Sequence, residues 1–184
     1  MALQKELIAL VSEGIGVAPE TVTIMDRQLL EAGMRTRSLR GRAKTPMTYR
    51  DAANLIIAAA WNRSPSDTVR LVADYRDLKA AKKNPLGETF GEAVESVLSH
   101  AAQYSEDFKA HPRAVTITLI GPVPYAIIEV QRYAEAEVDE NAGLIGFGPW
   151  EGRINEQPVV RRVDLRASAY LAIAESIADG LRDA

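Results

Sequence analysis

Six cationic side chains lie between residues 34 and 50, and no aspartate or glutamate lies among them. Because the whole chain has a formal net charge of −3, this segment of charge +6 leaves the remaining residues at −9. A basic segment on an acidic body indicates a local anionic partner, and DNA phosphate is the obvious candidate. The six cations are Arg35, Arg37, Arg40, Arg42, Lys44 and Arg50.

The residues before this basic segment have the spacing of two helices joined by a tight turn. Ser12 is a small residue at the expected crossing of the helices, and Gly16, four positions later, lets the chain turn. Pro19 fits the first turn of the second helix. Val22 and Met25 follow at helical spacing, so we expect both to pack back on the first helix.

Taken together, residues 8–27 resemble the helix-turn-helix of bacterial repressors, and the basic segment lies where a winged helix carries its wing. Two departures are Ser12, where alanine is usual, and a missing preceding helix, which we expect residues 49–61 to replace. The resemblance implies that the second helix enters the major groove and that the wing reaches phosphates. The implied DNA contacts are Glu20, Thr21, Thr23, Ile24 and Arg27 on the helix and Arg35, Arg37, Ser38, Arg40, Arg42 and Lys44 on the wing.

A second resemblance covers roughly Glu6 to Leu78. This stretch, with its Gly–Arg segment followed by residues 46–55, is similar to uncharacterised proteins of bacterial phages and mobile elements. It implies a phage or mobile-element setting, without a function of its own.

The apolar periodicity predicts a helical first part and a second part that contains strands. Thr48 and Asp51 have the spacing of an acidic variant of the capping box, so we expect a helix to begin there. Helices are expected at residues 3–13, 19–32, 49–61, 64–78 and 87–104. After residue 114 the alternation indicates strands at 114–120, 125–131, 144–147 and 159–165, followed by a helix at 167–181.

These elements predict an α+β fold in two domains. Residues 1–104 would form an N-terminal winged helix-turn-helix with accessory helices, and residues 114–184 a small antiparallel sheet with a terminal helix. We expect the second domain to mediate dimerisation or to act as a sensor. The apolar face of its last helix is the interface candidate, through Tyr170, Leu171, Ile173, Ile177 and Leu181.

Several other classes of function find no support in the sequence. The chain has no cysteine, which excludes disulfides and fits a cytoplasmic location. No apolar run is long enough for a membrane span, and the N-terminus does not resemble a signal peptide. His100 and His111 lie in unrelated contexts, and the acidic residues at 135–140 lack the spacing of a calcium loop. We therefore expect no catalytic residue, no metal site and no cofactor, and hence no enzyme.

The sequence as a whole predicts a sequence-specific double-stranded-DNA-binding protein, a transcriptional regulator of repressor type that acts as a homodimer. One alternative is a phage DNA-packaging or replication-initiation factor, which would also bind DNA. Another is a module that binds a protein partner or a ligand, with the helical part serving only as scaffold.

Overall fold

A computed structural model describes residues 3–37, 45–61, 65–111, 115–130, 143–148 and 161–182 of the chain. Its described residues form seven α-helices, one 3₁₀ helix and a four-stranded antiparallel sheet, which confirms the α+β class. The helices are α1 (Gln4–Ile15), α2 (Pro19–Glu31), α3 (Tyr49–Trp61), η1 (Pro65–Asp67), α4 (Thr68–Arg76), α5 (Phe90–Gln103), α6 (Ser105–Ala110) and α7 (Ala167–Arg182). The strands are β1 (Val115–Gly121), β2 (Tyr125–Val130), β3 (Gly143–Phe147) and β4 (Arg161–Arg166).

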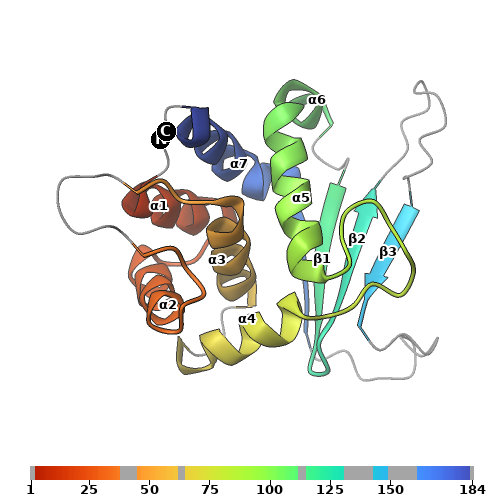
Figure 1. Cartoon of the computed structure of the whole chain (residues 1–184), viewed down its shortest axis with the longest axis horizontal. Helices are drawn as coiled ribbons and strands as arrows, with labels where there is room; N and C mark the ends of the chain where they lie inside the picture. Colours follow the sequence, from red (N-terminus) through yellow and green to blue (C-terminus); the bar gives the residue numbers. More distant parts are fainter. Residues whose placement is uncertain are drawn as a thin grey trace.

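Helices α1, α2 and α3 cluster at one end of the molecule, and the sheet lies at the other end (Figure 1). Helix α3 is the central element of the helical cluster, because every residue from Asp51 to Trp61 is buried. It packs against α1, α2, α4 and α5. The expectation that residues 49–61 supply the third helix, packed on the first two, is confirmed.

The sheet has the strand order β3-β2-β1-β4, and all neighbouring strands run antiparallel. Ile117 of β1 pairs with Ile128 of β2 on one side and with Leu165 of β4 on the other, and all three side chains are buried. Register partners in neighbouring strands point to the same side of the sheet, so these three residues form part of one apolar face. Helices α5 and α7 lie between that sheet and the α1–α3 cluster in Figure 1.

The two expected parts of the chain share one hydrophobic core in the described residues. The hydroxyl of Tyr75 on α4 donates to the carbonyl of Ile120 on β1 at 2.7 Å, and that of Tyr170 on α7 donates to Val115 at 3.0 Å. Helix α7 also crosses α1 closely, because a Cβ on Gly14 would collide with the Ala169 carbonyl. The sheet and the helices therefore stabilise one another directly.

This packing corrects the expected dimer interface. The apolar face of α7 points into its own chain, where Tyr170, Ile173 and Ile177 are at most 1% exposed and Leu171 is 8% exposed. Helix α7 uses this face against α1 and α5. Such a face is not free for a second copy of the chain. The side chain of Leu181, the fifth residue of the expected interface, lies outside the part of the chain that the structure describes.

Two local predictions also need correction. Helix α6 occupies Ser105–Ala110, whereas the sequence pattern assigns these residues to the polar connection between the two parts. The helix expected to end at Leu78 is shorter, because it begins as the 3₁₀ turn η1 and α4 ends at Arg76. Residues 79–81 leave the helix to pair with Thr89 and with Phe147 of β3.

Candidate nucleic-acid interface

The turn between α1 and α2 is built around Ser12 and Gly16. Gly16 has φ 76°, a left-handed conformation that glycine adopts without strain, and its amide donates to the Ser12 carbonyl at 2.9 Å. The Ser12 hydroxyl donates in turn to the carbonyl of Val17 at 2.6 Å. Ser12 is a position at which the chain departs from the repressor pattern, and its hydroxyl adds a side-chain bond across the turn that an alanine there would lack.

The inner face of α2 is part of the core of the helical cluster. Val22, Met25 and Leu29 are each at most 1% exposed, and α2 packs against α1 and α3. The expected packing of Val22 and Met25 is therefore confirmed. Burial of this apolar stripe fixes the rotation of α2, so the opposite face of the helix is presented to solvent.

The outer face of α2 carries the side chains predicted to read DNA. Glu20, Thr23, Ile24 and Arg27 are exposed, with Ile24 at 48%, and Thr21 is half-buried. The outer face also carries Glu31, which accepts from Arg27 at 2.8 Å. Such an exposed pair holds its partners weakly, so Arg27 can exchange Glu31 for another acceptor at low cost.

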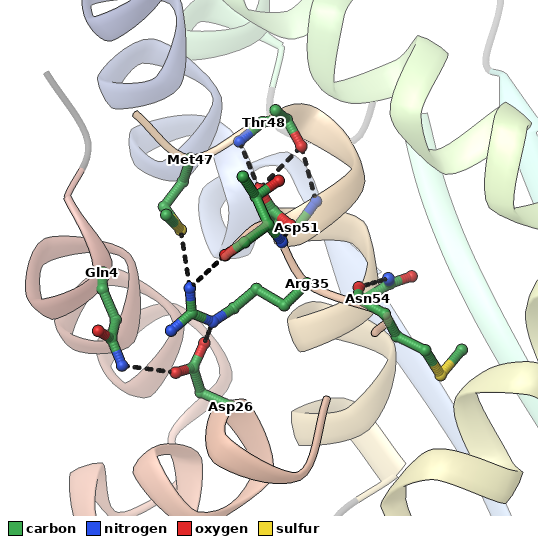
Figure 2. A network of polar contacts seen from close by, with 9 residues as sticks. Gln4, Asp26, Arg35, Met47, Thr48, Asp51 and Asn54 are labelled. Carbon is green, nitrogen blue, oxygen red and sulfur yellow. Dashed lines mark hydrogen bonds and ion pairs between the residues drawn. The ribbon is translucent and has the colours of Figure 1, made fainter. Parts of the chain in front are cut away.

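Arg35 has a different environment from the one expected. It is only 6% exposed, and its Nε lies 2.8 Å from Oδ1 of Asp26, which is fully buried (Figure 2). This contact is an ion pair without hydrogen-bond alignment, while the Arg35 Nη1 donates to the carbonyl of Thr36 at 2.8 Å. Because its guanidinium is held inside the chain, Arg35 is removed from the predicted phosphate contacts.

Asp26 is a carboxylate inside the helical cluster. Burial raises the pKa of Asp26, and this effect outweighs the opposing influence of Arg35 and of the hydrogen bond from Gln4 at 2.8 Å. The sequence reasoning missed this contact. The sequence nevertheless contains a sign of this contact. Asp26 lies between Val22 and Leu29 on the apolar face of a helix, and a charged residue in that position requires a partner inside the protein.

The chain that leaves α2 is fastened to the start of α3 by side chains of α3. The Asn54 amide donates to the carbonyl of Met34, and the amide of Thr36 donates to Oδ1 of Asp51 at 2.7 Å (Figure 2). Asn54 is itself held by Arg76, whose Nη1 donates to its Oδ1 at 2.7 Å. Asp51 thus makes the capping contacts expected of it and a further bond to Thr36, which the sequence pattern does not predict.

Two cations of the basic segment are both described and exposed, namely Arg37 and Arg50. Neither makes an ion pair with another side chain in the described part of the chain. Arg37 directly follows the fastened Thr36, and Arg50 lies in the first turn of α3. The other predicted wing residues, Ser38, Arg40, Arg42 and Lys44, lie outside the described residues.

Other candidate groups do not assemble into a site. His100 is exposed on α5, with Nδ1 2.8 Å from the Ser96 carbonyl, and His111 is exposed at the end of α6. Within the described ranges, no three acidic or histidine side chains are placed to hold a metal ion. None of the described helices is both long and apolar enough to cross a membrane.

Comparison of the chain with protein-family models, with curated proteins and with solved structures finds no match in any of the three.

Proposed function

We propose that this protein binds double-stranded DNA through the outer face of α2, with Arg37 and Arg50 as phosphate contacts beside it. The observation that carries the proposal is the orientation of α2, whose apolar face is buried on α1 and α3 while its polar face is exposed after a three-residue turn. A helix presented in this way has the form required to enter a major groove.

The side chains of α2 divide the work of recognition. Arg27 can donate to guanine and Glu20 can accept from cytosine, while Ile24 offers an apolar contact to a thymine methyl group. Glu20 and Glu31 make this helix face acidic apart from Arg27, so it supplies little attraction to phosphate. The electrostatic affinity therefore has to come from the neighbouring basic segment, from Arg37 and Arg50 together with Arg40, Arg42 and Lys44.

The regulatory role remains part of the proposal in the form suggested by the sequence, a repressor of phage or mobile-element type that binds a two-fold site as a homodimer. DNA packaging and replication initiation are the rival roles. Selection of bound fragments from a random DNA pool distinguishes them. A pseudo-palindromic site supports a dimeric regulator, whereas a non-repeated site argues against that role.

The experiment for DNA binding uses a fluorescent random duplex titrated at several salt concentrations. The double variant Arg37→Ala/Arg50→Ala is compared with Lys82→Ala/Lys83→Ala, which removes the same charge from two exposed residues in the loop between α4 and α5. The plot of log K against log salt has a negative slope. We expect this slope to become shallower by about 0.9 for each phosphate that an arginine no longer neutralises. The lysine variant should keep the wild-type slope; equal slopes for all three proteins would refute the interface.

A second function is favoured by Ile24, which is 48% exposed in the middle of the outer face of α2. An apolar residue between Glu20 and the Arg27–Glu31 pair is also suited to a protein partner. Glu31→Gln separates the two functions. On DNA it removes a negative charge and releases Arg27, so affinity should rise, whereas a protein-docking face gains no DNA affinity from this change.

A further inference from the structure

Three consecutive residues after α2 are each held by a different side chain. The carbonyl of Met34 accepts from Asn54, Arg35 is paired with Asp26 at 2.8 Å, and the amide of Thr36 donates to Asp51 at 2.7 Å. No strand pairing is assigned to these residues. Side chains of α2 and α3 therefore determine the position at which the chain reaches Arg37.

The carboxylate of Asp51 also holds the chain where it returns to α3. Its Oδ2 accepts from the amide of Thr48 at 2.8 Å and from the Thr48 hydroxyl at 2.9 Å, while its Oδ1 accepts from Thr36. Asp51 is 2% exposed, so water does not compete strongly for these bonds. One side chain thus joins Thr36 and Thr48, the two residues between which most of the basic segment lies.

We propose that Asp51 is a positioning residue of the DNA interface. By bonding Thr36 and Thr48 together, it fixes the backbone from which Arg37 extends at the foot of the first turn of α3, which carries Arg50. The backbone at Arg37 is then tied to the helix turn that carries Arg50, so the two cations need less ordering when they bind phosphates. This inference rests on the proposed DNA-binding function.

A comparison within the chain separates this role from ordinary capping. Thr89 and Glu92 form a capping box at the start of α5, with the same spacing as Thr48 and Asp51. Glu92 is exposed, and its Oε2 accepts from the backbone amides of Glu88 and Thr89, which lie directly before the helix. Capping a helix therefore does not require a bond like the one that Asp51 accepts from Thr36, fifteen residues away in the sequence.

The test compares Asp51→Asn with Glu92→Gln in the full chain. Each variant removes the charge of one capping carboxylate. Asp51 accepts through both of its oxygens, so asparagine must place its NH2 group against a donor of Thr36 or Thr48. Glu92 accepts through Oε2 alone, so glutamine can keep the oxygen that its donors need. We expect faster hydrogen exchange of the Thr36 and Thr48 amides and a smaller salt slope for random duplex DNA. The expected decrease in slope is about 0.9 for each arginine that no longer reaches a phosphate. Glu92→Gln should change neither quantity.

A second variant covers the case in which Asp51→Asn does not fold. Asp51→Glu keeps the carboxylate and the usual capping-box residue at this helix position, but its longer side chain moves the oxygen away from Thr36. We expect faster exchange at Thr36, near-normal exchange at Thr48 and a smaller salt slope. Retention of the wild-type slope in a folded Asp51 variant with fast exchange at Thr36 overturns the inference and leaves DNA binding intact. Absence of DNA binding by the wild-type protein overturns both.

Discussion

The two capping boxes of this chain have the same residue spacing and different surroundings. At α5, Glu92 is exposed, and the three side-chain bonds of the box join Thr89, Glu92 and the neighbouring Glu88. Thr48 and Asp51 make the same reciprocal bonds, but Asp51 also bonds to Thr36 and lies next to the buried pair of Asp26 and Arg35. The same local motif thus only caps the helix at α5, whereas at α3 it also joins the start of the helix to the segment that follows α2.

This contrast shows that the contribution of a polar group to stability depends on its burial and on its partners from distant parts of the chain. An exposed carboxylate can exchange its bonds with water, whereas a buried carboxylate leaves donors without partners when it is removed. We call Asp26, Arg35, Asp51 and Asn54 the buried network. Replacements in the buried network should therefore be more costly than replacements in the α5 box.

The largest effect should come from breaking the Asp26–Arg35 pair on one side. Asp26→Ala or Arg35→Met leaves an unpaired buried charge, and each should lower the free energy of unfolding by about 3–5 kcal/mol. The double variant Asp26→Leu/Arg35→Met removes both charges and should recover most of that loss. Urea denaturation of the four proteins measures the coupling; additive losses in the double variant would contradict the pair.

A smaller effect is expected from Asp51→Ala measured against Glu92→Ala. Loss of Asp51 leaves the amide of Thr36 and both donors of Thr48 without their acceptor, at about 2–4 kcal/mol in total. Loss of Glu92 exposes its donors to water, so we expect a cost of about 1 kcal/mol or less. Thermal unfolding of both variants tests the ranking, and equal costs would show that burial does not distinguish the boxes.

The sequence predicted those parts of the fold that depend on local periodicity. Helices α1, α2 and α3, the β1–β2 hairpin and α7 lie close to their expected ranges, because each has an apolar stripe or an alternation of its own. Helix α6 was missed because its six residues are too few to show a helical stripe. The dimer role of α7 was overturned because periodicity marks a buried face without saying what covers it.

The candidate site was less predictable from the sequence, because its determining contacts are not local. The bond between Gln4 and Asp26 joins residues 22 apart, and that between Thr36 and Asp51 joins residues 15 apart. Charge counting treated Arg35 and Arg37 alike, although one is buried and the other is exposed. Only the internal position of Asp26 on α2 signalled that a nearby cation would be taken as its partner.

The smallest effect concerns pH, where the two regions should respond with opposite sign. The pKa of Asp26 is raised above its ordinary 3.8, so the native state binds its proton more tightly than the unfolded chain. Its contribution to stability is therefore greatest below 3.8 and decreases as pH rises through the native pKa. The backbone amides of Thr89 and Glu88 lower the pKa of Glu92 below 4.5, so its contribution is present above 4.5 and is lost as pH falls.

Variants that cannot ionise isolate these two contributions. The stability of the wild type minus that of Asp26→Asn should fall as pH rises from 3.8 through the native pKa of Asp26. The stability of the wild type minus that of Glu92→Gln should rise as pH increases from the native pKa of Glu92 to 4.5. Urea denaturation at a series of pH values measures both differences. If both change in the same direction, the charge of Asp26 is as well accommodated as that of Glu92, and the contrast between a buried and an exposed carboxylate fails for this pair.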